Sequence, residues 1–180
     1  MHPASTARAV RIRRAESRDA AALAEFCART FRETYDAHNS EEDMALHLHT
    51  HFSEALQRAE IADADAVMLV AEHEGALAGY AKVRRGAAPA CVGGERPVEV
   101  QRFYVDRAWQ GTGLAYRLMD AAHEWARALG ADTLWLGVWE RNPRAIAFYG
   151  KCGFMDVGAW TFTLGTDVQN DRLMVQKVGG

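Results

Sequence analysis

The sequence predicts a mixed α/β fold in a single domain, and three observations favour it. Alternating apolar, β-branched and aromatic residues at 98–105 precede a helical pattern at 114–129 and an apolar strand at 133–139. A strand–helix–strand crossover of this length implies that the two strands pair in parallel. Residues 67–83 are typical of a β-hairpin, and residues 154–178 are typical of a closing antiparallel pair of strands.

The N-terminal part of this fold is predicted to be a strand followed by two helices. Residues 10–14 alternate apolar and charged side chains, as a half-buried strand does, after a flexible leader at 1–8. Asp19 can cap a helix that continues through Tyr35, and residues 39–43 are typical of a loop with a helix cap. The second helix is predicted from its apolar residues Met44, Leu48 and Phe52.

The next elements are a hairpin and a long loop. Strands at 67–72 and 76–83 are joined by a turn that is short enough for a hairpin. Residues 84–97 are rich in Gly, Ala and Pro, which predicts a mobile loop. This loop leads into the strand at 98–105, which stops at Asp106.

The C-terminal elements are indicated by the residues at their ends. The helix that begins near Gly113 is stopped by Gly130. Asn142 and Pro143 begin another helix, as a cap followed by proline at the first helical position, and Gly153 ends it. The last two strands are predicted at 154–164 and 173–178, with a turn-rich connection at 165–171.

Composition excludes several classes of protein. With 180 residues, 49% of them hydrophobic, the chain can bury the core of one domain. A net charge of −3 provides no basic surplus, so we expect no nucleic-acid partner. No apolar run is long enough to span a bilayer, and no signal peptide is evident, so we expect a cytoplasmic protein without a membrane partner. Reduced thiols are expected for Cys27, Cys91 and Cys152, which are odd in number and lack metal-ligand spacing.

The stretch from strand to helix at residues 98–118 predicts an anion-binding loop. Backbone N–H groups at a helix N-terminus lack partners, and the helix dipole favours negative charge there. A P-loop would need Gly-Lys-Ser/Thr, whereas Gly113 is followed by Leu114. A dinucleotide fingerprint would need a third glycine where the chain has Tyr116. We therefore expect a phosphate-bearing ligand of another kind; the alternative is a helix N-terminus with two incidental glycines.

Two motifs identify a family resemblance. The segment from Gln110 to Ala115 resembles the Arg/Gln-x-x-Gly-x-Gly/Ala loop that binds the coenzyme A pyrophosphate in the GCN5-related N-acetyltransferases. A second segment, in the right order after it, resembles the Asn-x-x-Ala-x-x-Phe-Tyr…Gly-Phe motif of the same superfamily. Its residues in this chain are Asn142, Ala145, Phe148, Tyr149, Gly153 and Phe154.

A narrower resemblance covers both ends of the chain. It is similar to the bacterial PaiA-like polyamine acetyltransferases in TFRETYDAHNSEEDM, LGVWERNPRAIAFYGKCGF and TFTLGTDVQNDRLMVQKV. The resemblance implies a mixed, mostly antiparallel sheet flanked by helices, in which the splayed fourth and fifth strands admit the pantetheine arm of acetyl coenzyme A. Acetyl coenzyme A would be the cosubstrate, and no metal is expected.

The resemblance also assigns the residues that would bind this cosubstrate. Backbone groups of the fourth strand would bind the pantetheine arm, since an unpaired strand edge is a ready template for an amide-rich ligand. N–H groups of the loop would hold the pyrophosphate. The residues are Phe103, Tyr104 and Val105 on the strand, Gln110, Gly111, Thr112, Gly113, Leu114 and Ala115 in the loop, and Asn142 and Tyr149 beyond it.

Direct acetyl transfer to an amine requires an acid and a base. Tyr149 matches the family tyrosine proposed to protonate the departing thiolate; the alternative is an aromatic residue packed under the cofactor. Related polyamine acetyltransferases have a glutamate on the fourth strand where this chain has Gln101, which cannot take a proton. Strand alternation puts Glu99 on the same face as Gln101 and Phe103. We therefore expect Glu99 to deprotonate the amine through water, with a surface salt bridge as the alternative.

Two further features permit functional interpretations. His47 and His51 lie at a helical spacing that a metal could use, but nothing nearby completes a ligand set, which favours solvated histidines. An acidic group could attract a polycationic substrate into a cleft, and the alternative is a solvated helix-capping face. This acidic group consists of Glu33, Asp36, Glu41, Glu42 and Asp43.

The sequence thus predicts an enzyme that acetylates a small primary amine, first of all spermidine or spermine. One alternative is acetylation of a protein N-terminus or a lysine, which would need an open peptide groove. Another is a sensor that binds coenzyme A without catalysis, which the glutamine at position 101 leaves open. The protein could form a homodimer. The preference for acetyl over larger acyl groups is inferred from the family resemblance.

Overall fold

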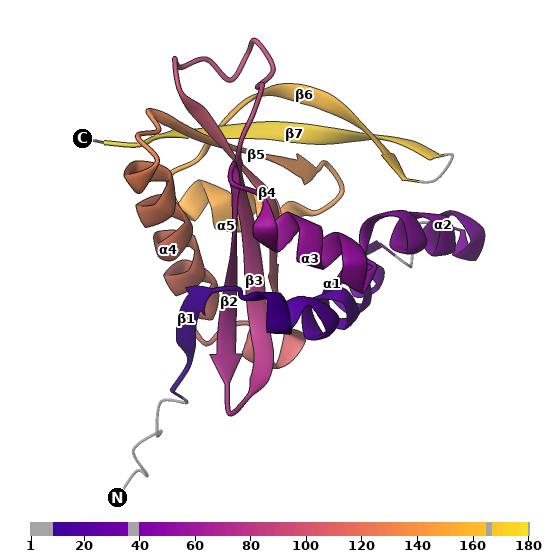
Figure 1. Cartoon of the computed structure of the whole chain (residues 1–180). Coiled ribbons are helices and arrows are strands. Elements are labelled where there is room, and N and C mark those ends of the chain that lie inside the picture. Colours follow the sequence, from indigo (N-terminus) through magenta and orange to yellow (C-terminus); the bar gives the residue numbers. More distant parts are fainter. Residues whose placement is uncertain (1–8, 36–39, 165–166, 180) are drawn as a thin grey trace, which may run out of the picture.

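The computed structural model describes residues 9–35, 40–164 and 167–179 (Figure 1). Within these ranges the strands form a seven-stranded sheet in the order β1-β2-β3-β4-β5-β7-β6. Neighbouring strands are antiparallel except β4 and β5, which are parallel, as the crossover predicted. The expected leader at 1–8 lies outside the described residues. None of the helices within these ranges is both long and apolar enough to span a membrane.

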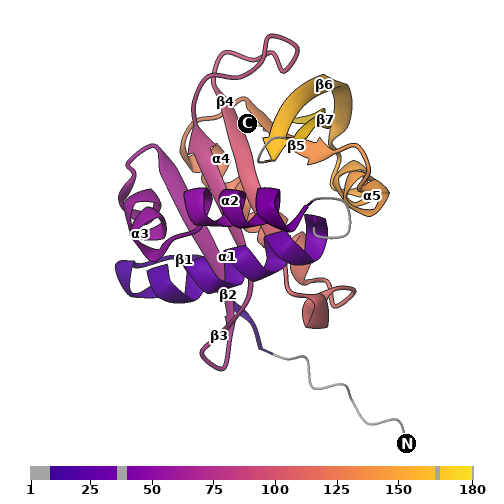
Figure 2. The same ribbon diagram turned by 90° about the vertical axis from the view of Figure 1, so that its right-hand side faces the viewer.

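The order of strands and helices along the chain is broadly the predicted one. The strands are β1 Arg11–Arg14, β2 Ala66–His73, β3 Ala76–Arg85, β4 Pro97–Val105, β5 Thr133–Trp139, β6 Met155–Leu164 and β7 Asp167–Lys177. The helices are α1 Ala20–Tyr35, α2 Glu41–His51, α3 Glu54–Ala62, α4 Leu114–Ala128 and α5 Pro143–Lys151. Helices α1, α2 and α3 lie on one face of the sheet, and α4 and α5 lie on the other (Figures 1 and 2).

The sheet separates two hydrophobic clusters, because alternate strand residues point to opposite faces. On the α4 face, Leu118 and Leu134 belong to a cluster that includes Tyr149 of α5. On the α1 face, Leu23 and Tyr80 belong to a second cluster. The three cysteines are unpaired, as expected: Cys27 is buried, Cys91 exposed and Cys152 half-buried.

Three elements differ from the sequence prediction. Asp19 does not cap α1, since its carboxylate accepts hydrogen bonds from Arg13 and the Glu16 N–H in a preceding turn. Helix α3 was not predicted; Ser53 caps it, and its one buried residue is the polar Gln57, so no apolar stripe reveals it. Strand β7 begins at Asp167, within the stretch predicted as a turn. Its first residues pair with β6 while side chains such as Val168 are exposed, so no buried face indicates a strand.

The sheet opens between its two parallel strands. Pairing of β4 with β5 covers the three positions from Pro97 to Glu99 and then stops, whereas β3 continues to pair with β4 as far as Val105. The edge of β4 that faces β5 therefore has no strand partner beyond Glu99 in the described structure. This confirms the splayed fourth and fifth strands that the family resemblance implied.

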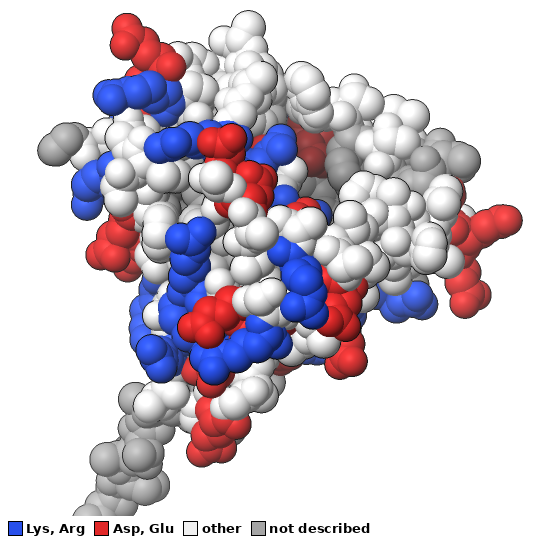
Figure 3. All heavy atoms as spheres, viewed as in Figure 1, with Lys and Arg blue, Asp and Glu red and all other residues white. Residues whose placement is uncertain are grey.

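A buried ion network ties α3 to the sheet. Glu60 accepts hydrogen bonds from Lys82 at 2.7 Å and from both terminal nitrogens of Arg102, at 2.7 and 3.0 Å. Burial alone would raise the pKa of the Glu60 carboxyl, but the charges of Arg102 and Lys82 outweigh it and hold that pKa below its ordinary value. Basic and acidic side chains are intermixed on the face shown in Figure 3.

Glu60→Gln is expected to lower the free energy of unfolding by about 2–4 kcal/mol at pH 7, because it leaves two cations in a largely buried site. Since folding lowers the pKa of Glu60, its contribution exists above the unfolded pKa and is lost as pH falls through the folded value. Urea unfolding at pH 7 and at about pH 3, below the ordinary glutamate pKa of about 4.3, measures both effects. Glu54→Gln is the matched control, since the Glu54–Arg58 pair is about half exposed. An equal loss in both variants would contradict the structural role of the network.

Candidate active site

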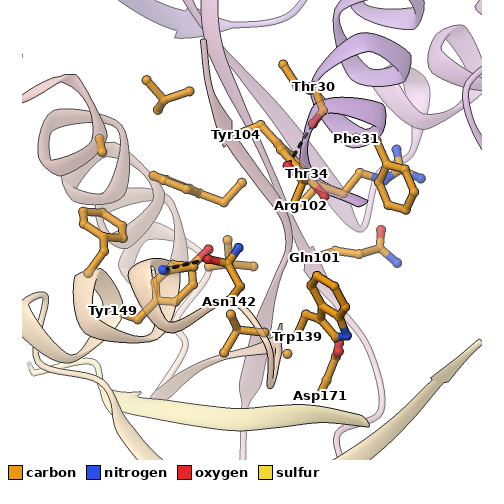
Figure 4. Close-up of a pocket in the computed structure, with 18 of the residues that line it drawn as sticks. Thr30, Phe31, Thr34, Gln101, Arg102, Tyr104, Trp139, Asn142, Tyr149 and Asp171 are labelled. Atoms are coloured by element: carbon orange, nitrogen blue, oxygen red, sulfur yellow. Dashed lines mark hydrogen bonds between the residues drawn. The ribbon is translucent and has the colours of Figure 1, made fainter. Parts of the chain in front are cut away.

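A pocket of about 1160 Å³ opens where β4 and β5 diverge (Figure 4). Residues from both faces of the sheet line it, so it passes through the sheet rather than lying on one face. What we call the α1 side comprises Phe31, Tyr35, Glu99, Gln101, Trp139 and Asp171. What we call the α5 side comprises Gln110, Gly111, Gly113, Ala115, Asn142 and Arg144.

The predicted pyrophosphate loop forms part of the α5 side. Gly111 and Gly113 have φ values of 80° and 86°, a left-handed conformation that only glycine adopts without strain. Gly113 is the N-cap of α4, so the unpaired N–H groups of the first turn of α4 follow directly. Two predicted loop residues do not line the pocket: Thr112 donates its hydroxyl to the Trp109 carbonyl, and the Leu114 side chain is buried.

Arg144 is a residue of the α5 side that sequence reasoning missed. Its guanidinium donates to Gln110 Oε1 at 2.6 Å, while Gln110 Nε2 donates to the Val105 carbonyl at 3.3 Å. This chain of hydrogen bonds holds a cation beside the loop, where an anionic ligand gains from it. Its position inside the Asn142–Ala145 motif, on the first turn of a predicted helix, was the signal that could have revealed it.

The unpaired edge of β4 carries the residues predicted to bind the pantetheine arm. Phe103, Tyr104 and Val105 line the pocket, and their side chains also pack in the core, Phe103 against Phe148 at 5.7 Å between ring centroids. Backbone groups and side chains can therefore act independently at these positions. The free edge and the glycine loop together offer what an extended, amide-rich ligand with a phosphate end requires.

Tyr149 and Asn142 come from α5. Asn142 lines the pocket and caps α5 with its side-chain oxygen, which accepts from the Ala145 N–H at 3.1 Å. Tyr149 is 8% exposed and lines the pocket among Phe103, Phe148 and Phe154. Burial, with a smaller effect of Tyr35, raises the pKa of the Tyr149 phenol well above its ordinary value. The phenol therefore stays protonated at neutral pH and can donate a proton.

Glu99 lies in the pocket wall, but not as strand alternation predicted. A β-bulge leaves Gln101 outside the register: Val83 pairs with Val100, and Lys82 pairs with Arg102. Val98 and Val100, which flank Glu99, pack with Phe103 in the cluster on the α4 face, so Glu99 points to the other face, where it forms an ion pair with Arg84. The prediction that Glu99 shares a face with Phe103 is therefore wrong, because an extra residue in one strand reverses the alternation.

The ion pair of Glu99 constrains its chemistry. Arg84 Nε donates to Glu99 Oε2 at 2.7 Å, so one carboxylate oxygen already has a cationic partner. The salt bridge that the sequence offered as the alternative for Glu99 is thus present. Its side chain is 16% exposed and lines the pocket.

The α1 side contains a further carboxylate that the sequence did not reveal. Asp171 of β7 lines the pocket beside Trp139, its register partner on β5 (Figure 4). Burial, with the negative charge of Glu140, raises the pKa of Asp171 to about 6. A signal did exist: strand alternation extended backward from Leu173 and Val175 puts Asp171 on their buried face. The residues just before Asp171 hide this signal, because exposed side chains such as Val168 make the start of β7 resemble a turn.

The histidines and the acidic group have mainly structural contacts. The rings of His47 and His51 stack at 4.1 Å, and burial lowers the pKa of His47 to about 4. In the described ranges no three His, Cys, Asp or Glu side chains are arranged to hold a metal. Glu33 lines the pocket and pairs with Arg29 at 3.0 Å. Glu41, Glu42 and Asp43 form the first turn of α2, and Asp36 lies outside the described residues.

Comparison with known proteins gives consistent matches. The model of the acetyltransferase (GNAT) family matches residues 25–154. An uncharacterized N-acetyltransferase of Mycobacterium tuberculosis is 35% identical over 160 residues, which covers 89% of this chain and 98% of the relative. Another, from Lactobacillus delbrueckii subsp. lactis, is 34% identical over 155 residues, which covers 84% of this chain and 90% of the relative.

Solved structures share the fold at lower identity. The PaiA N-acetyltransferase of Thermoplasma acidophilum, crystallised in complex with coenzyme A, superimposes with a TM-score of 0.76 at 21% identity, covering 94% of this chain and 99% of that one. The spermidine/spermine N-acetyltransferase SpeG of Vibrio cholerae superimposes with a TM-score of 0.63 at 21% identity, covering 94% and 95%.

Proposed function

Because the chain belongs to the acetyltransferase (GNAT) family and is an acetyl-coenzyme-A-dependent N-acetyltransferase, we propose that it acetylates a small primary amine, with spermidine or spermine as the first candidates. The observation that carries this proposal is the pocket that passes between β4 and β5. Of the carboxylates that line it in the described ranges, Glu33 and Glu99 are paired with Arg29 and Arg84. The negative charge that favours a cationic amine on the α1 side is therefore that of Asp171. The fold shared with SpeG is compatible with a polyamine acceptor.

The α5 side is proposed to hold acetyl coenzyme A. The loop from Gln110 to Ala115 would bind its pyrophosphate through backbone N–H groups, with Arg144 adding a positive charge nearby. The free β4 edge at Phe103, Tyr104 and Val105 would bind the pantetheine arm. An N–H of this edge would also donate to the thioester oxygen as that oxygen becomes negative.

Proton transfers complete the proposed mechanism. The acceptor amine attacks as the neutral form, although the pKa of alkylamines such as lysine is about 10.4, so a base must remove a proton. Tyr149 is proposed to protonate the departing thiolate, which its protonated phenol at the pocket wall supports. Its packing among phenylalanines keeps the hydroxyl in place and is compatible with this role.

The acceptor class is tested by a panel of amines. Thiol release from acetyl coenzyme A is measured with spermidine, spermine, lysine, an aminoglycoside and short peptides with free N-termini. Fastest release with the polyamines would support the proposal. Preference for peptides would instead indicate a protein acetyltransferase, and release with none despite tight coenzyme A binding would indicate a sensor.

The sequence predicts Glu99 as the base, and Glu99→Gln tests that prediction. If Glu99 accepts the proton, this variant loses about 100-fold or more in kcat/KM, and its rate no longer rises with pH as the carboxyl ionises. The measurement is the pH–rate profile with the preferred amine. An unchanged profile with a weakened fold would assign Glu99 to its ion pair with Arg84 alone.

A further inference from the structure

Two buried side-chain oxygens on the α1 side lack a hydrogen-bond partner in the described part of the chain. They are Oε1 of Gln101, on β4, and Oδ1 of Asp171, on β7. Both residues line the pocket (Figure 4). Gln101 lies on β4, at one side of the opening in the sheet, and Asp171 lies on β7, which pairs with β5 at the other side. A buried acceptor without a donor costs about 1–3 kcal/mol, so two of them beside one cavity indicate a ligand with several donors.

Within the described ranges, Asp171 is also the carboxylate of the pocket that has no cationic partner. Of the acidic residues that line the pocket within the described ranges, Glu33 pairs with Arg29 and Glu99 pairs with Arg84. No such pair is present there for Asp171. A buried carboxylate is costly unless a cation joins it.

The sheet makes room for this carboxylate. Gly137 lies on the same face of β5 as Trp139, next to Asp171, and a Cβ at position 137 would lie 3.2 Å from Asp171 Oδ2. That approach is tighter than ordinary van der Waals contact, so a side chain at 137 would push the carboxylate away. Tyr35 of α1 is close enough to Asp171 and to Tyr149 of α5 for their charges to affect one another's pKa values.

We propose that Gln101 and Asp171 together hold the ammonium group of the acceptor amine, and that Asp171 rather than Glu99 takes its proton. An ammonium group has three N–H donors and one positive charge. Two of its N–H groups can donate to Gln101 Oε1 and Asp171 Oδ1, and its charge balances that of the Asp171 carboxylate. Gln101 then binds the amine without needing to be a base. This inference rests on the proposed function, since it requires an amine acceptor.

The proton balance is closed by groups of the pocket. Asp171 accepts one proton from the ammonium, and the freed nitrogen lone pair forms the new N–C bond to the acetyl carbon. The C–S bond breaks, and the thiolate takes the phenolic proton of Tyr149. The nitrogen, which still carries a surplus proton after attack, returns one to the tyrosinate, and Asp171 releases its proton to solvent. The net products are the amide, free coenzyme A and one proton.

The surroundings of Asp171 suit a base that works near neutral pH. Its burial and Glu140 raise the pKa of the carboxyl to about 6, so it is ionised at pH 7 and is still able to bind a proton. The other charged and titratable groups that line the pocket are Glu33 and Tyr35 of α1, His47 and His51 of α2, Arg84 of β3, Glu99, Arg102 and Tyr104 of β4, Arg107 after β4, Arg141 after β5, and Arg144 and Tyr149 of α5.

Asp171→Asn tests this proposal because it keeps the shape and removes the base. We expect kcat/KM for the amine to fall about 100-fold at pH 8, and the rise of the wild-type rate through pH 6 to disappear. Glu99→Gln should keep that rise. Folding raises the pKa of the Asp171 carboxyl to about 6, so its ionisation lowers the stability of the fold as pH rises to that value and beyond. Asp171→Asn removes this cost and should therefore raise Tm at pH 8. If Asp171 served only to stabilise the fold, Asp171→Asn would lower Tm at pH 8 instead.

Two more variants and a control sharpen the test. Gln101→Leu should raise KM for the amine about 10-fold with a smaller change in kcat, since it removes one hydrogen bond to a charged group. Gly137→Ala should impair the reaction by displacing the carboxylate, even if Asp171→Asn fails to fold. Asp156→Asn is the matched control: Asp156 pairs with Arg172 on the exposed face of β6 and should leave the profile unchanged.

Binding of spermidine to the protein saturated with coenzyme A, measured by calorimetry, separates this inference from the proposed function. Weaker binding to Asp171→Asn than to wild type would support it. Equal binding, or loss of the pH dependence in Glu99→Gln but not in Asp171→Asn, would overturn it while leaving the amine acetyltransferase intact. Wild-type protein that neither binds nor acetylates any amine of the panel would overturn both.

Discussion

Tyr149→Phe is expected to lower kcat by about 10²–10⁴-fold, the usual contribution of a positioned acid. The phenol lies in the pocket wall, and burial keeps its pKa far above neutrality, so it is protonated over the working pH range. The loss should therefore be the same at every pH between 6 and 9. Thiol release at saturating acetyl coenzyme A measures it, and KM for acetyl coenzyme A should change little.

The fold should survive this substitution. The ring of Tyr149 contacts Phe103, Phe148 and Phe154, and phenylalanine preserves these contacts. Tyr80→Phe is the matched control, because it also removes a buried hydroxyl but lies in the cluster on the α1 face rather than in the pocket. Wild-type turnover in Tyr149→Phe would remove the acid role and leave Tyr149 as a packing residue.

Gly113→Asp is expected to raise KM for acetyl coenzyme A by about 100-fold or more, because a carboxylate would stand at the site proposed for the pyrophosphate. Two unit charges 4 Å apart repel by about 4 kcal/mol at a surface-like dielectric, and 1.4 kcal/mol corresponds to a tenfold change. The φ value of 86° at Gly113 is one that Asp and Asn tolerate better than most residues. Calorimetric titration with coenzyme A measures the effect directly.

Gly113→Asn separates charge from conformation in this experiment. It has nearly the same shape as the aspartate variant and the same backbone demand, so the difference between the two variants is electrostatic and should shrink in high salt. Gly93→Asp is a second control, since Gly93 has a φ of 68° and open space around it but does not line the pocket. Equal affinity in Gly113→Asp and wild type would place the pyrophosphate elsewhere.

Local chemistry explains which parts of the fold were predictable. The anion-binding loop depends on Gly111 and Gly113 and on the first turn of α4, all within a few residues of one another. The start of α5 likewise needs only Asn142 and Pro143. Helix α3 and the first half of β7 differ from the prediction because neither has a repeating pattern of buried apolar residues: the buried residue of α3 is Gln57, and Val168 of β7 is exposed.

The candidate site was predictable on one side of the pocket only. The residues proposed to bind acetyl coenzyme A lie in one continuous strand–loop–helix unit and in the motif that begins at Asn142, so the sequence alone could identify them. Glu99 was nominated from regular strand alternation, which the bulge at Gln101 breaks. Asp171 lies in the stretch for which the sequence predicts a turn, so its position on a strand beside the pocket is not predictable.

The sequence by itself determined the family, the order of elements and the phosphate-binding loop, because each depends on residues close together in the chain. Only the tertiary structure decided what faces the other side of the pocket. The pairing of Arg84 with Glu99 and of Trp139 with Asp171 is set by the register of strands that are distant in sequence. A one-residue bulge is enough to redirect the β4 side chains, so which carboxylate is left unpaired in the pocket emerges only when the strands are assembled.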